Sequence, residues 1–195
     1  MSSSPSSAST LWEEFNARRN TAAPIEREFA LYAIAKRLEL DMSNVDVDLS
    51  EHLVITDGGN DKGCDYVCID PDQGQIFVIQ SYISLDPPLT RDPKLNKTHQ
   101  LRQAVNWLLL GDFTNMRPET KSIAELVRQL MENDSITNLE FWYLHNQLHD
   151  TNVNSELDAI QNLGRELIED KSTATLATRQ VTLTEILQWQ KTLDD

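Results

Sequence analysis

Two short apolar segments separated by four turn-forming residues constrain the fold most strongly. Residues 64–70 (CDYVCID) and 75–83 (QIFVIQSYI) are rich in β-branched and aromatic side chains, and PDQG (71–74) lies between them. Strands favour β-branched and aromatic residues, whereas Pro, Asp and Gly are typical of turns. The stretch therefore predicts a β-hairpin. The segment HLVI (52–55) predicts a further strand, which the turn cluster TDGGND (56–61) joins to the hairpin.

Helices are predicted on both sides of these strands. Thr10 and Glu13 have the spacing of a capping box, for a helix over about 10–19. Pro24 suits the first turn of a second helix, over about 25–38. Three prolines exclude regular structure from residues 85–94. Apolar residues that recur at helical spacing predict later helices; they are Leu101, Ala104, Val105, Leu108 and Leu109, then Ile123, Leu126, Val127, Leu130 and Met131, then Leu157, Ile160, Gly164, Leu167 and Ile168.

Two more strands alternate with these helices. They are predicted over 138–146 (NLEFWYLHN) and 178–183 (TRQVTL), and Thr182 then caps a last helix. This order predicts an α/β fold with a mixed β-sheet flanked by α-helices on both faces. We predict a single domain over residues 10–195, preceded by a polar, disordered leader over residues 1–9.

Composition limits the function classes. Hydrophobic residues make up 39% of the chain, enough for a core, but they form no run of about eighteen, the length that spans a membrane. The polar start MSSSPSSAST lacks the apolar stretch of a secretory signal, and Cys64 and Cys68 are too few for a disulfide framework. A cytoplasmic location is therefore expected. Because the net charge is −14, any binding of nucleic acid must depend on a local basic patch, a bound metal or another subunit.

The hairpin brings three polar residues towards one end of the sheet. Asp65 lies at the start of one strand, and Gln80 lies near the end of the other. Residues two apart on a strand point to the same side, so Gln80 and Tyr82 share a face. A carboxylate and a neighbouring oxygen are typical ligands of a hard divalent cation, which activates water for phosphodiester hydrolysis.

The ordered motifs around these residues resemble a known family. They are the Gly-Asp-Lys-Gly-x-Asp stretch from Gly59 to Asp65, with Asn60 inserted, the strand ending Ile79-Gln80-Ser81, and the aromatic strand and helix of residues 141–160. Together they resemble the nuclease core of the restriction-endonuclease-like (PD-(D/E)XK) superfamily. More narrowly, they resemble the N-terminal part of the abortive-infection phage-resistance (AIPR) family. Family members are usually longer, so the chain is similar to their N-terminal domain or to a compact relative.

The resemblance implies a nuclease domain in phage defence that uses Mg²⁺ or Mn²⁺ and acts on nucleic acid, with DNA as the expected substrate. Carried over by position, Asp65 is the central metal ligand, and Gln80 stands where many relatives have glutamate. Glu28, on the predicted helix 25–38, matches an acidic position that completes the metal site. Lys62 is normally a solvated turn lysine, but it is also a candidate for the catalytic site.

Tyr82 departs from the family pattern, which expects lysine. Tyrosine is neutral at neutral pH and does not offset phosphate charge. Three interpretations remain open. A lysine from elsewhere in the chain takes over the role (a migrated lysine), or the site binds metal and nucleic acid without cutting. In the third, Tyr82 is only a strand residue of a site that has lost its activity. The candidates for a migrated lysine are Lys62, Lys94 and Lys97. Dimerisation is a further expectation, because nuclease domains that cut both strands often pair.

Two histidines follow the aromatic strand. His145 and His149 are four apart, a spacing that suits a metal only on a helix, whereas Asn146 and Asp150 favour a turn. We interpret the histidines as structural hydrogen-bonding groups.

Overall fold

The computed structural model describes residues 7–38, 53–55, 63–85, 88–111 and 116–194. Five strands within these residues form one sheet, in the order β1-β2-β3-β4-β5. The strands are β1 (Leu53–Ile55), β2 (Tyr66–Asp70), β3 (Gln75–Tyr82), β4 (Asn138–His145) and β5 (Thr175–Val181). The first three are antiparallel, whereas β4 runs parallel to both β3 and β5. The predicted α/β class with a mixed sheet is confirmed, and so is the β2–β3 hairpin.

The helices lie close to their predicted positions. They are α1 (Ala8–Arg18), α2 (Ile25–Arg37), α4 (Leu95–Val105), the π-helical turn η1 (Asn106–Leu110), α5 (Pro118–Glu132), α6 (Thr151–Ile168) and α7 (Leu183–Asp194). The predicted Thr10 cap is wrong. Ser7 caps α1 instead, since its side chain accepts from the Thr10 N–H at 3.2 Å. The helix therefore begins at Ala8, within the predicted leader.

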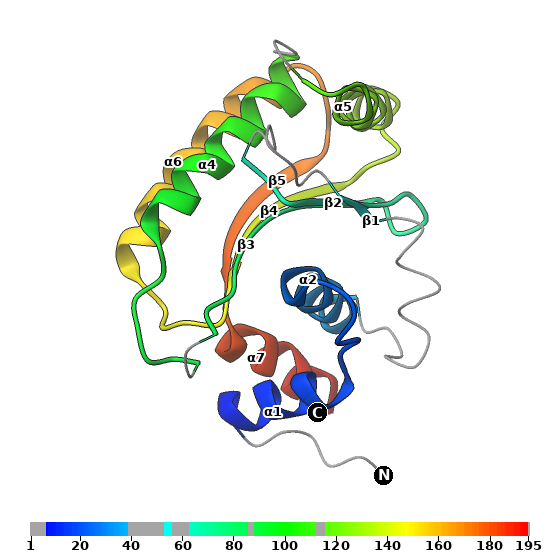
Figure 1. Ribbon diagram of the computed structural model, residues 1–195. Helices are drawn as coiled ribbons and strands as arrows, with labels where there is room; N and C mark the ends of the chain where they lie inside the picture. The colour runs from blue at the N-terminus through cyan, green and yellow to red at the C-terminus, as the bar shows by residue number, and fades with distance from the viewer. Residues whose placement is uncertain (1–6, 39–52, 56–62, 86–87, 112–115, 195) are drawn as a thin grey trace.

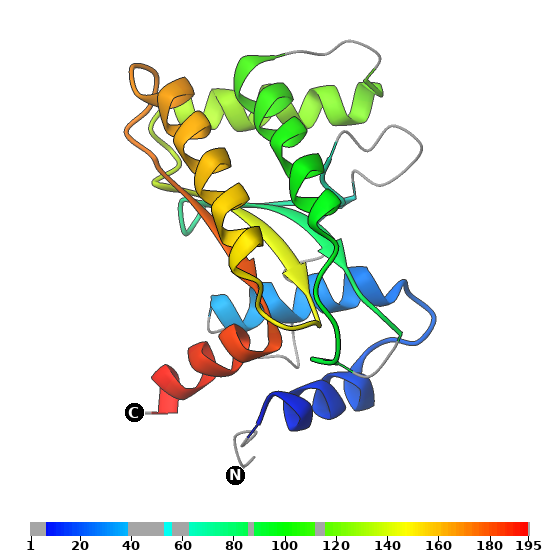
Figure 2. The ribbon, with the colours of Figure 1, turned by 90° about the vertical axis from the view of Figure 1, so that its left-hand side faces the viewer.

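The sheet is curved, and helices cover both of its faces (Figure 1). Helices α4, α5 and α6 lie on the outer, convex side, while α2 and α7 lie in the hollow with α1 beyond them (Figures 1 and 2). Each side has its own apolar cluster because side chains alternate along each strand. On β3, Ile76 and Val78 belong to the convex cluster, and Phe77 and Ile79 to the concave one.

This alternation places the predicted site residues. Tyr82 packs against the convex cluster, so Gln80, two residues earlier, faces the same side. Cys64 and Cys68 are buried and form no disulfide with each other, and burial, aided by Asp70, raises the pKa of Cys68 to about 12. The thiol of Cys68 therefore stays protonated at neutral pH. Within the described ranges, no helix is long and apolar enough to cross a membrane.

Candidate functional site

Asp65 and Gln80 lie opposite each other where the β2–β3 pair ends. The register pairs Tyr66 with Ile79, which makes Asp65 and Gln80 the next pair along. Gln80 Nε2 donates to Asp65 Oδ2 at 2.8 Å, and the Ser81 N–H donates to the same oxygen at 2.7 Å. Asp65 is 9% exposed and Gln80 is fully buried. The structure thus brings together two residues that were predicted to meet.

A glycine lets the chain pass close to α4 just before Asp65. Gly63 has φ +91°, and a Cβ on it would lie 1.8 Å from the Gln100 carbonyl oxygen. The backbone conformation and the lack of space both require glycine there. Gly63 therefore fixes the approach of the loop two residues before the carboxylate.

The oxygens at this pair suit a hard divalent cation. Gln80 Oε1 and Ser81 Oγ are buried and have no hydrogen-bond partner among the described residues. A buried acceptor without a partner costs about 1–3 kcal/mol, and a cation at Gln80 Oε1 would offset that cost. Mg²⁺ takes one or two carboxylates, carbonyl-type oxygens and several waters, so Asp65 and Gln80 fit Mg²⁺ or Mn²⁺ by donor type. Because the amide nitrogen now faces Asp65, shared binding requires the amide to rotate.

A lysine lies beside Tyr82. The Nζ of Lys94, the residue before α4, is 4.7 Å from the centre of the Tyr82 ring. At this distance the ammonium is attracted to the ring face. Gln80 and Tyr82 point the same way, roughly 7 Å apart by strand geometry. A positive charge therefore lies beside Tyr82, two residues along β3 from Gln80.

The other predicted site residues are placed differently. Glu28, the third predicted ligand, accepts from Arg27 at 2.8 Å and from the Asn20 N–H at 3.2 Å. Its helix, α2, packs against the concave cluster, whereas Gln80 faces the convex side. Lys62 lies outside the described residues. In the part of the chain that the structure describes, no group of three His, Cys, Asp or Glu residues is arranged to hold a metal.

His145 makes hydrogen bonds within the fold, as predicted. It is fully buried at the end of β4, and burial, aided by the charge of His149, lowers its pKa to about 3. Its Nδ1 accepts from the Gln147 N–H at 3.2 Å, so the ring proton is on Nε2. Nε2 lies 2.9 Å from the Gln180 side-chain amide, which accepts from it once oriented with its oxygen towards the ring. Both ring nitrogens are thus used within the fold.

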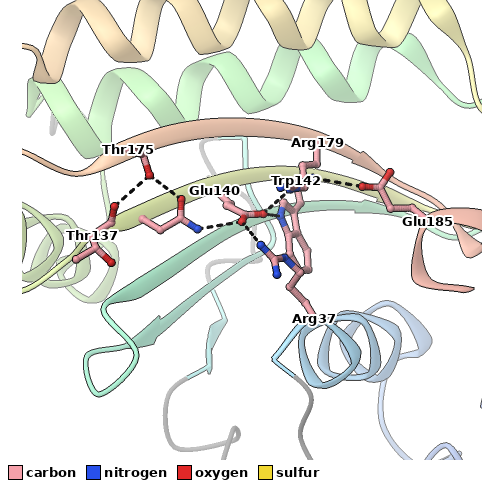
Figure 3. Close-up of polar contacts among 8 residues, drawn as sticks. Arg37, Thr137, Glu140, Trp142, Thr175, Arg179 and Glu185 are labelled. Atoms are coloured by element: carbon pink, nitrogen blue, oxygen red, sulfur yellow. Dashed lines mark hydrogen bonds and ion pairs between the residues drawn. The ribbon is translucent and has the colours of Figure 1, made fainter. Parts of the chain in front are cut away.

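A buried carboxylate on the concave face was not predicted from the sequence. Glu140 of β4 is 1% exposed. Its Oε1 accepts from Arg37 at 3.0 Å and from Asn138 at 2.9 Å (Figure 3). Its Oε2 accepts from Trp142 Nε1 and from Arg179 Nε, each at 2.8 Å. The network connects α2 to β4 and β5.

The electrostatics of this network indicate a structural role. Burial alone would raise the pKa of Glu140, but hydrogen bonds from Trp142 and Asn138 and the two arginine charges outweigh it and lower the pKa. Arg179 also lies 3.5 Å from Glu185, so two arginines meet two carboxylates and the net charge is zero. The available sequence signal was a single charge inside the apolar strand NLEFWYLH.

Comparisons with protein-family models, with curated proteins and with solved structures find no match for this chain.

Proposed function

We propose that this chain is a divalent-metal-dependent nuclease domain with a restriction-endonuclease-like fold. Asp65 and Gln80 hold Mg²⁺ or Mn²⁺, and Lys94 supplies the positive charge that Tyr82 lacks. The observation that carries the proposal is the ammonium of Lys94 over the Tyr82 ring, on the strand face that Gln80 shares. Of the three readings of Tyr82, this geometry favours the migrated lysine.

Each residue has a distinct task in this proposal. The bound cation would polarise a phosphodiester and lower the pKa of a water. Asp65 and the Gln80 oxygen orient and retain the cation. Lys94 binds a non-bridging phosphate oxygen and offsets its charge, which matters in a chain whose net charge is −14. The Tyr82 ring keeps the ammonium in place through the cation–π contact.

The biological setting follows from the resemblance described above. The chain acts on nucleic acid, with DNA as the expected substrate, as part of an AIPR-like defence against phage. Its acidic surface repels free DNA, so binding depends on the cation site and on additional positive charge from a second copy or a longer partner chain.

A second candidate is a nuclease-fold module that binds nucleic acid or dimerises without cutting. Its specific support is the state of Asp65, whose Oδ2 already accepts two N–H donors while Gln80 is fully buried. A carboxylate satisfied in this way has a structural use that requires no cation.

Plasmid nicking in Mg²⁺ or Mn²⁺ separates the two candidates. The proposal predicts that the wild type nicks and that Asp65→Ala loses the activity, whereas Asp70→Ala, at the other end of β2, retains it. If the wild type never cuts but Tyr82→Lys does, the second candidate is correct. If the wild type cuts and Asp65→Ala cuts equally well, the assigned site is wrong.

A further inference from the structure

Asn146, directly after β4, extends the β3–β4 pairing with its side chain. The two strands end at the Tyr82–His145 pair. Beyond it, the Ser84 N–H donates to Asn146 Oδ1 at 3.0 Å, and Asn146 Nδ2 donates to the Ser84 carbonyl at 2.9 Å. The amide thus acts as one more backbone unit of the parallel ladder. Asn146 is fully buried.

The same turn also holds residues 88–94, the approach to α4. The Leu89 N–H donates to the Asn146 carbonyl at 3.0 Å. The Arg91 N–H donates to Gln147 Oε1 at 3.1 Å, and the Arg91 carbonyl accepts from the Leu148 N–H at 3.1 Å. Leu89 has φ +60°, a left-handed conformation that non-glycine residues keep only where their surroundings impose it. These contacts supply that restraint.

The path ends at Lys94. Its carbonyl accepts from the Tyr143 hydroxyl at 3.0 Å, and its ammonium lies over Tyr82. Gln147 Nε2 donates to Asn146 Oδ1 at 3.0 Å, and this bond holds the Gln147 amide with its Oε1 towards the Arg91 N–H. We propose that Asn146 is a positioning residue that holds the approach to α4 and so places Lys94 at the site. Its relevance to cutting rests on the role proposed above for Lys94.

The position of Lys94 can be read without any activity. Reductive ¹³C-methylation labels the lysine amines, and Lys94→Arg identifies the Lys94 signal in a ¹H–¹³C spectrum. Because the amine lies over an aromatic ring, this signal is expected upfield of the other lysine signals. Asn146→Ala removes the bonds to Ser84 and the side-chain partner of Gln147 but keeps the backbone carbonyl that accepts from Leu89, so a partial move towards the position of a solvated lysine is expected. Gln161→Ala is the matched control, since its amide accepts from the Thr178 N–H elsewhere in the fold; it is expected to leave the signal in place.

A second variant guards against misfolding of the first. Gln147→Ala removes the acceptor of Arg91 and the donor to Asn146, and a downfield move at least as large as that of Asn146→Ala is expected. An upfield Lys94 signal that neither variant moves would overturn the inference, and so would a wild-type signal that is not upfield.

Nicking measured on the same variants connects position to activity. Misplacing the ammonium by about 1 Å is expected to cost about 10²-fold in kcat, so Asn146→Ala should lose that much and Gln161→Ala should not. Full activity in an Asn146→Ala protein whose Lys94 signal has moved would overturn the positioning role. A wild type that never nicks would remove the proposed function, while the spectra would still decide whether Asn146 places Lys94.

Discussion

The ammonium of Lys94 lies 4.7 Å from the centre of the Tyr82 ring, although the two residues belong to different elements. Tyr82 ends β3, and Lys94 immediately precedes α4. The contact places a cation beside Tyr82, the position at which the sequence departs from the expected lysine. It also distinguishes Lys94 from Lys97, which lies one turn further along and has no such ring contact in the described structure.

Asp65→Asn tests whether the carboxylate has a use beyond packing. The amide keeps an oxygen that can accept from Ser81 and Gln80, so we expect the free energy of unfolding to change by at most about 1–2 kcal/mol. Cation binding needs the negative charge, so Mn²⁺ affinity measured by calorimetry should fall at least tenfold, by analogy with the loss of a metal-supporting group. Asp70→Asn is the matched control. Equal Mn²⁺ affinity in Asp65→Asn and the wild type would contradict the assignment.

Gly63→Ala should be far more damaging than another glycine substitution at positive φ. Its Cβ would meet the Gln100 carbonyl oxygen at 1.8 Å, so α4 or the loop has to move. Gly74, with φ +63°, would place a Cβ 3.1 Å from Thr137 Oγ1, and its replacement is expected to cost about 1 kcal/mol. Urea unfolding should show a loss of at least about 3 kcal/mol for Gly63→Ala. Similar losses for both variants would show that the close approach to α4 is not rigid.

Glu140→Ala should destabilise the fold because Arg37 and Arg179 lose the carboxylate that both of them contact. Removing one member of a buried ion pair costs about 3–5 kcal/mol. Arg37 and Arg179 are about a third exposed, at 31% and 35%, so we expect a loss near the lower end. The control is Glu125→Ala, which breaks an exposed pair with Lys121 and should cost less than about 1 kcal/mol. Equal losses would contradict the role given to the network.

The pH dependence of this effect has a definite sign. The pKa of Glu140 is lower in the folded protein than in the unfolded chain, where a glutamate titrates near about 4.3. The carboxylate therefore contributes stability above that pH and loses it as the pH falls towards the folded value. The stability difference between wild type and Glu140→Gln should be largest near neutral pH and shrink below about pH 4. A constant difference across this range would show that the charge is not involved.

The lowered pKa of His145 predicts a separate loss of stability as the pH falls, and this loss begins at a higher pH than that of Glu140. Its folded pKa of about 3 lies below the ordinary histidine value of about 6.5, so the unfolded chain takes up a proton first as the pH falls. Stability should decline by up to about 1.4 kcal/mol per pH unit below about 6.5. His145→Gln should reduce that slope. The same slope in the wild type and in His145→Gln would show that His145 is not buried as a neutral group.

Local sequence patterns predicted much of the fold, because strand alternation and helical spacing are properties of neighbouring residues. The turn residues 71–74 predict the hairpin of residues 64–83, and the register of that hairpin brings Asp65 into contact with Gln80. The start of α1 was misplaced because Ser7 and Thr10 are both good caps, and the structure uses Ser7.

Long-range contacts explain what the sequence did not decide. Lys94 was one of three candidate lysines, and the segment that it ends is bonded to Gln147 and Tyr143, 56 and 49 residues away from their partners. Glu140 was missed because its partners come from α2 and β5, and only the fold brings Arg37 and Arg179 to one carboxylate.

Plasmid nicking by Lys94→Gln and Lys97→Gln tests the central claim most directly. Both variants remove one lysine charge within the same turn, but only Lys94 lies over Tyr82. The account predicts Mg²⁺- or Mn²⁺-dependent nicking by the wild type, a loss of about 10²-fold or more in Lys94→Gln, and near wild-type activity in Lys97→Gln. Equal activity of Lys94→Gln and the wild type would contradict it.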